Sequence, residues 1–178
     1  IDDEIMPDYL SYMLNLIQKY NVNLVFCSTS PKKDFVQKDK DIKEKVYSKE
    51  KALKAFLYRK IKPGIGSILC KKAIFEKYNF NFAVNYKYSE DIHMIWRLFN
   101  VNDYVVETTK KLYIYYPNDG SVMSRFDDSR LHSIQLILKL EDYFKETKSY
   151  FYPIYVQDRS GEGMDTQGAR NVLDEPTL

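Results

Sequence analysis

The sequence predicts a mixed α/β fold. Apolar residues recur every three or four positions within residues 7–20, 49–60, 89–100 and 127–147, as in amphipathic helices. Short apolar runs at residues 22–27, 68–70, 104–108 and 111–116 are typical of strands. The two patterns follow one another along a chain of 178 residues with 44% apolar content, which is enough for one packed core.

The first predicted helix begins at Pro7, since proline suits the first helical turn. Leu10, Met13, Leu14 and Ile17 follow at helical spacing, so we expect them to form the face that packs on the rest of the domain. Residues 22–27 then form a short, mostly apolar run, which predicts a buried strand ended by Pro31.

Residues 31–51 are rich in lysine and carry few apolar side chains. This pattern predicts a solvated surface excursion. The lysines also fit a lid on the acceptor side that is attracted to anionic lipid or phosphate groups. Residues 49–60 return to helical spacing, with Leu53, Phe56 and Leu57 on one face.

Residues 62–67 form a predicted turn that leads into a strand at 68–70 and a helix at 71–77. The turn contains Gly64 and Gly66, and glycine allows a backbone to approach a ligand closely. The pair lacks the third glycine of a dinucleotide-binding motif. A plain tight turn and a phosphate cradle both remain open, and Gly66 is the donor-binding candidate on the second interpretation.

A helix is predicted from Glu90, with Ser89 as its N-cap. Glu90 and Asp91 lie in its first turn, where the helix dipole favours acids by about 0.3–1 kcal/mol without any catalytic role. A partly desolvated carboxylate at a helix start can also act as a general base. We expect His93 to be an ordinary polar side chain with a hydrogen-bond partner.

Two strands are predicted at residues 104–108 and 111–116, then a turn at 117–120 and a last helix at 127–147. Residues 157–178 contain no lysine and no aromatic residue, and they carry five acidic and two basic residues. Such a segment cannot bury much apolar surface, which predicts a disordered or foreign tail. The predicted domain therefore covers residues 1–156.

Charge and cysteine content narrow the functional classes. The 27 basic and 25 acidic residues leave a net charge of +2, which creates no strong attraction to nucleic acid or membranes. The two cysteines lie in apolar runs and make no zinc-binding spacing with the two histidines, which suits a reducing cytoplasm. No apolar run approaches the roughly 20 residues that span a bilayer, and no signal-peptide pattern is present at the start.

The chain begins without Met and with an acidic pair, Asp2 and Asp3. Two carboxylates at the end of a strand can hold a hard divalent cation through oxygen ligands. Because Ile1 cannot be a native start, we expect the domain to continue upstream.

Several segments taken together, in order and spacing, resemble the bacterial family 2 glycosyltransferases of the GT-A fold. They are DDEIMPDYLSYML, VNLVFCS, KPGIGSILCKKAIFEKYNFNF, YKYSEDIHMIWRLF and YIYYPNDGSVMSR, and they cover about residues 1–150. The resemblance implies a GT-A-like mixed sheet flanked by helices. It also implies that the N-terminal nucleotide-binding half precedes Ile1.

The resemblance implies roles for specific residues. Asp2 and Asp3 match the later part of the acidic motif that binds Mn²⁺ or Mg²⁺ and contacts the donor diphosphate. Asp91 matches the general base, with Glu90 beside it. Ser121 and Arg125 fall in a segment that closes over the donor phosphates.

The expected reaction is a single, inverting transfer of a sugar from a nucleotide-sugar donor, with UDP as the expected nucleotide, to a saccharide or lipid-linked acceptor. The usual setting of such enzymes is surface polysaccharide or lipooligosaccharide synthesis in the cytoplasm, with peripheral contact at the inner face of the membrane. We expect this chain alone to be inactive and to self-associate through uncovered sheet surface.

The alternative is a non-catalytic interaction module. With 16 Tyr, 10 Phe and many Lys, the chain could present an aromatic and basic face that binds carbohydrate or nucleic acid. The even charge balance and the regular spacing of the aromatic residues favour a core or rim position for most of them, and we expect no nucleic-acid partner.

Overall fold

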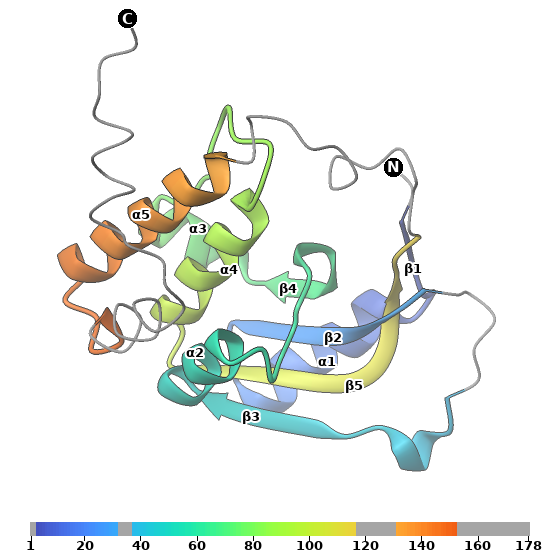
Figure 1. Cartoon of the computed structure of the whole chain (residues 1–178). Helices are drawn as coiled ribbons and strands as arrows, with labels where there is room; N and C mark the ends of the chain where they lie inside the picture. The colour runs from blue at the N-terminus through green and yellow to red at the C-terminus, as the bar shows by residue number, and fades with distance from the viewer. Residues whose placement is uncertain (1–2, 32–36, 117–130, 153–178) are drawn as a thin grey trace, which may run out of the picture.

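The computed structural model describes residues 3–31, 37–116 and 131–152, which form one curled mixed sheet flanked by helices (Figure 1). The mixed α/β prediction is therefore confirmed. In chain order, the elements are β1 (Glu4–Ile5), α1 (Tyr9–Tyr20), β2 (Leu24–Ser30), η1 (Asp39–Asp41), β3 (Glu44–Ser48), α2 (Lys49–Leu57), η2 (Ile65–Ser67), β4 (Ile68–Cys70), α3 (Lys72–Tyr78), α4 (Glu90–Val101), β5 (Tyr104–Ile114) and α5 (Leu131–Glu146).

Strand β5 is the centre of the sheet. It pairs in parallel with β2 on one side, and β2 pairs in turn with antiparallel β4. On its other side β5 pairs antiparallel with two strands in succession, first β3 and then β1. Figure 1 shows β5 bending between these two partners.

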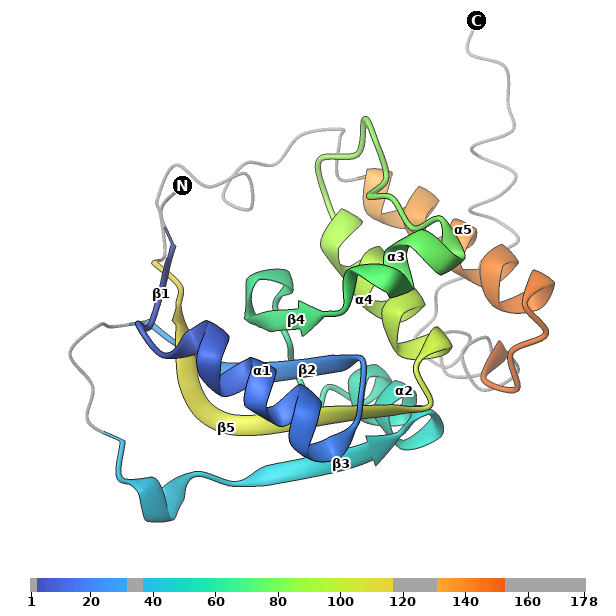
Figure 2. The same ribbon diagram turned by 180° about the vertical axis from the view of Figure 1, so that it is seen from behind.

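Helices cover both faces of this sheet, because successive strand residues point to opposite sides. On one face α1 packs Met13 and Ile17 against Val25 and Val106, and Figure 2 shows this helix in front of the sheet. On the other face α2, α4 and α5 bury a larger core around Leu24 and Phe26. Its fully buried side chains include Leu53, Phe99, Phe144 and Phe151.

Strand β5 corrects the prediction of two separate strands at 104–108 and 111–116. Its register against β2 moves from Cys27 opposite Thr108 to Ser28 opposite Lys111, so Thr109 and Lys110 form a bulge. The bulge stays hydrogen-bonded, since Thr109 N–H donates to Lys43 O at 2.9 Å. The chain therefore bends without breaking the strand.

Strand β3 corrects the prediction of a surface loop at 31–51, of which residues 32–36 lie outside the described part. Residues 44–48 pair with β5, and Tyr47 is buried with its hydroxyl donating to Glu107 at 2.6 Å. Lysines along the outer strand of a sheet are common because they discourage pairing with other chains. A charged sequence that resembles a loop can therefore form an edge strand.

The buried face of helix α1 agrees with the prediction at Met13 and Ile17 and differs from it at Leu10 and Leu14. Leu10 and Leu14 are 54% and 49% exposed, although the spacing placed both in the packed face. The buried stripe instead consists of Tyr9, Met13, Leu16 and Ile17. Pro7 lies in the turn before the helix, and Asp8 occupies the N-cap position.

The remaining helices lie where the sequence patterns predict them, although α2 ends at Leu57 and not at residue 60. Ser48 caps α2, since its hydroxyl accepts a hydrogen bond from Lys51 N–H at 3.5 Å. Asn79 ends α3 in the left-handed conformation that often terminates helices. Residues 127–130 and the predicted tail at 157–178 lie outside the described part. Within the described ranges, no helix has the length and apolar character needed to cross a bilayer.

Candidate functional site

Asp3 lies just before β1, against the end of β5. Its Oδ2 accepts a hydrogen bond from Tyr113 Oη at 2.5 Å, and its Oδ1 accepts one from Tyr116 N–H at 3.2 Å. The pairing of Glu4 with Ile114 brings the two segments together. The carboxylate is therefore held at a fixed position on the edge of the sheet.

Tyr113 connects Asp3 to Gly66. Burial and the Asp3 carboxylate raise the pKa of Tyr113 to about 12, so its hydroxyl stays protonated and donates at neutral pH. A side chain on Gly66 would place its Cβ only 2.3 Å from the Tyr113 ring. The glycine therefore admits the ring that holds Asp3, which is a structural reason for its presence.

Asp3 suits one part of a divalent-metal site. Among the described residues, no group of three His, Cys, Asp or Glu side chains converges on one point. Mg²⁺ in phosphate-transfer sites is usually held by one or two carboxylates together with substrate phosphates and water. The single carboxylate of Asp3 fits that kind of shared site, and its predicted companion Asp2 lies outside the described part.

A cationic cavity of about 440 Å³ lies further along β5. Arg59, Lys60, Lys62 and Lys111 line it together with Ser28, Thr29 and one carboxylate, that of Glu107, so the cations outnumber the acid by four to one. Lys111 and Tyr113 alternate with buried Leu112, so their side chains leave β5 on the same side. The cavity therefore gathers positive charge on the side of β5 that also carries Tyr113, the partner of Asp3.

Glu90 and Asp91 occupy the first turn of α4, as predicted, and both are half-buried. Asp91 Oδ1 accepts a hydrogen bond from Ile92 N–H at 2.7 Å. Ser89 occupies the predicted N-cap position. Its side chain makes no capping hydrogen bond, so the prediction is correct for the position and wrong for the interaction. Its hydroxyl instead lies 2.8 Å from that of Ser133 on α5.

The backbone of Ser89 is left-handed, with φ of 64°. A residue other than glycine in this conformation carries a cost of about 1–3 kcal/mol and is often found at functional sites. The contact with Ser133 holds this conformation from outside the helix. The start of α4, and with it Asp91, is thereby fixed against α5.

His93 was expected to be a polar side chain with a hydrogen-bond partner, and the structure differs at one of its ring nitrogens. It is 8% exposed, and its Nδ1 has no hydrogen-bond partner among the described residues. Burial, aided by the charges of Arg97 and Lys139, lowers the pKa of His93 to about 4. The ring is therefore neutral at physiological pH.

The structure describes three of the predicted acidic site residues, and they form two groups. Figures 1 and 2 both show β4 between β1 and α4. Asp3 directly precedes β1, and Glu90 and Asp91 begin α4. No described contact joins the two groups. Ser121 and Arg125, like Asp2, lie outside the described part.

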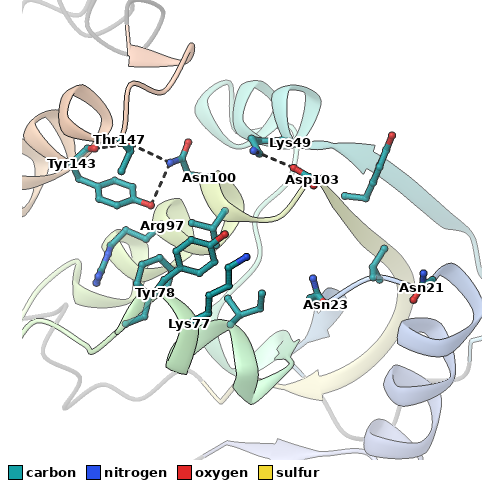
Figure 3. Close-up of a pocket in the computed structure, with 15 residues that line it drawn as sticks. Asn21, Asn23, Lys49, Lys77, Tyr78, Arg97, Asn100, Asp103, Tyr143 and Thr147 are labelled. Carbon is teal, nitrogen blue, oxygen red and sulfur yellow. Dashed lines mark hydrogen bonds and ion pairs between the residues drawn. The ribbon is translucent and has the colours of Figure 1, made fainter.

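A second cavity contains none of the predicted site residues. It measures about 660 Å³ and lies at the other end of α4, near Arg97 and Asn100 (Figure 3). Helix α3 and the turn between α1 and β2 complete its wall. Sequence reasoning missed this cavity because its residues come from segments far apart in the chain.

The two cysteines offer no reactive thiol. Burial raises the pKa of both Cys27 and Cys70 to about 12, so each stays protonated at neutral pH. A protonated thiol is a poor nucleophile and a poor metal ligand.

Comparison of the sequence with models of known protein families and with curated proteins finds no match.

Proposed function

We propose that this chain forms the acceptor-side part of an inverting, metal-assisted glycosyltransferase of the GT-A type. It transfers a sugar from a nucleotide-sugar, with UDP as the proposed nucleotide, to a saccharide or lipid-linked acceptor. The observation that carries the proposal is the carboxylate of Asp3, fixed at the end of β5, together with the lysine- and arginine-lined cavity further along the same strand. An acid for a metal and cations for phosphates are what a nucleoside diphosphate requires.

The curled mixed sheet with helices on both faces is compatible with a GT-A domain. The proposed setting is the cytoplasm, with peripheral contact at the inner membrane face, in surface polysaccharide or lipooligosaccharide synthesis. Both of these points rest on the resemblance of the sequence segments.

In the proposed reaction, Asp91 accepts the proton of an acceptor hydroxyl. The hydroxyl oxygen then forms a bond with the anomeric carbon while the bond from that carbon to the diphosphate oxygen breaks. Attack from the face opposite the leaving group inverts the anomeric centre. Glu90 lies beside Asp91 and orients the acceptor.

The leaving diphosphate gains negative charge as the bond breaks. A bound Mn²⁺ or Mg²⁺ would neutralise part of that charge. Asp3 would hold the ion, and Tyr113 keeps the Asp3 carboxylate in place through its hydrogen bond. Arg59, Lys60, Lys62 and Lys111 attract the phosphates into the cavity that they line.

Replacing Asp91 by Asn tests the assignment of the base. In the protein encoded by the complete reading frame, Asp91→Asn should lower the transfer rate about 10²- to 10⁴-fold, the usual contribution of a general base. Donor affinity should stay unchanged, and both quantities can be measured with UDP-sugars in the presence of Mn²⁺.

The matched control is Glu76→Gln, which neutralises an exposed carboxylate on α3. It should leave both the rate and the donor affinity unchanged. Loss of donor affinity in Asp91→Asn would assign Asp91 to the donor site instead. Absence of any sugar chemistry, together with salt-sensitive retention on nucleic acid, would favour the interaction module.

A further inference from the structure

The cavity at the far end of α4 contains a wall of stacked planar groups. Tyr78 stacks on Phe80 with ring centroids 5.6 Å apart, and the Arg97 guanidinium lies 4.2 Å from the centre of the Phe80 ring. The same guanidinium is 5.7 Å from the Tyr143 ring. The wall therefore joins the end of α3 to α4 and α5.

Hydrogen bonds from α4 to α5 and the chain beyond it hold this wall in place. Asn100 Nδ2 donates to Tyr143 Oη at 3.3 Å, and Asn100 Oδ1 accepts from the Ser149 hydroxyl at 2.8 Å. Arg97 donates to the backbone oxygen of Asn81 at 3.1 Å. The aromatic and cationic groups are thus ordered before any ligand arrives, which lowers the entropy cost of binding.

The cavity carries positive charge that the described residues do not neutralise. Lys49 pairs with Asp103 at 3.2 Å, but neither Lys77 nor Arg97 pairs with a carboxylate in the described part. Figure 3 shows the Lys77 amine reaching toward the open space between Asn23 and the Lys49–Asp103 pair. An anionic ligand would supply the missing charge.

The other lining groups suit sugar hydroxyls and sugar rings. The side-chain amides of Asn21 and Asn23 make no hydrogen bond within the described ranges, so they can bond to a ligand. Tyr78 and Tyr104 are 38% and 58% exposed at the cavity. Exposed tyrosines offer a flat apolar ring for the apolar face of a sugar and a hydroxyl for its polar edge.

From these observations we infer that the cavity binds an anionic saccharide, whose sugar ring rests on Tyr78 and whose acid pairs with Lys77, while Arg97 adds positive charge behind the aromatic wall. The ligand carries a carboxylate or a phosphate. Arg97 follows Asp91 by six helical residues, or roughly 9 Å along the axis of α4. The cavity is therefore a binding site separate from the proposed reaction centre, and it does not depend on the proposed transfer.

The experiment is a titration of the full chain with each probe. Calorimetry measures the affinity, and NMR of the backbone amides shows which residues the probe affects. The probes are glucuronate, glucose 6-phosphate, neutral glucose, inorganic phosphate and a short single-stranded oligonucleotide. Glucuronate or glucose 6-phosphate should bind at least about tenfold more tightly than glucose and phosphate, with shifts at residues 77–81 and 97–104. Preference for one of the two acids identifies the charged group and supports the site in either case.

Lys77→Gln and Tyr78→Leu should each weaken this binding about tenfold, the effect of losing one charge-assisted hydrogen bond or one ring contact. Both residues are exposed on α3, so the variants should fold. Lys72→Gln is the matched control, because Lys72 lies on the same helix outside the cavity and should leave the affinity unchanged. Asp91→Asn should also bind normally, which separates this site from the proposed transfer.

Three results would overturn the inference. Glucose that binds as tightly as the charged sugars would remove the role of the cations, and phosphate that matches glucose 6-phosphate would reduce the cavity to a simple anion site. Tighter binding of the oligonucleotide at the same residues would instead identify a nucleic-acid surface.

Discussion

Gly66 carries no side chain, and the ring of Tyr113 occupies the space that one would take. We predict that Gly66→Ala destabilises the protein by about 1–3 kcal/mol, the usual cost of overpacking. The displaced ring would also lose its hydrogen bond to Asp3. Urea unfolding measures the change in stability, and Mn²⁺ affinity measures the effect of losing the hydrogen bond to Asp3.

Gly64→Ala is the matched control, since a Cβ at Gly64 would meet nothing within 4 Å. The unfolding free energy of this variant should lie within about 0.5 kcal/mol of the wild-type value, as for most substitutions at uncrowded surface sites. Equal stability of the two alanine variants would show that Tyr113 does not require the space at Gly66.

The positions of individual residues in the fold were predicted correctly where local pattern was sufficient. Glu90 and Asp91 lie in a first helical turn because the apolar spacing behind them fixes the helix. Tyr113 was missed, since its role depends on partners more than 40 residues away at Gly66 and Asp3. No local signal in the sequence marks such a contact.

At the scale of elements, the packing of α4 on α5 contains a buried ionisable group, His93. Its pKa is about 4 in the folded protein, against the ordinary value of 6.5, so the unfolded chain takes up a proton first as pH falls. We predict that this group costs up to about 3 kcal/mol of stability as pH falls from about 6.5 to 4. Urea unfolding across this range measures the change.

His93→Leu removes the titrating ring and should flatten this part of the stability profile. His132→Gln removes the only other histidine and should retain the decline of the wild type. If all three proteins lose stability in parallel between pH 6.5 and 4, carboxyl groups rather than His93 cause the loss of stability at low pH.

Element prediction failed where pairing over long sequence distances decides the structure. Residues 44–48 have too much charge to suggest a strand, yet pairing with β5 and burial of Tyr47 make them one. The bulge at Thr109 and Lys110 was read as a break between strands, because residues without partners opposite them lack the alternation of a regular strand. Helices were predicted better because their periodicity is local.

At the scale of the whole molecule, α1 leaves apolar surface uncovered. Leu10 and Leu14 are four residues apart, so they lie together on the outer side of the helix, and both are about half exposed. We predict that the isolated chain self-associates through this surface. Sedimentation velocity at increasing concentration measures the association.

The double variant Leu10→Lys, Leu14→Lys should make the chain more monomeric and change its unfolding free energy little. Leu131→Lys is the control, since Leu131 is equally exposed on α5 but lies elsewhere on the molecule. A wild-type chain that stays monomeric throughout the concentration range would contradict the prediction.

The central place of β5 has a consequence for the order in which the protein is made. β1, β2 and β3 all precede β5 in the chain, and each of them pairs with it. A ribosome that has released residues 1–103 has therefore made three strands whose shared partner does not yet exist. Until Tyr104–Ile114 emerges, β2 can pair only with β4. The edges of these strands therefore stay without their main partner until β5 has been made, and chaperone binding would be most useful in that interval.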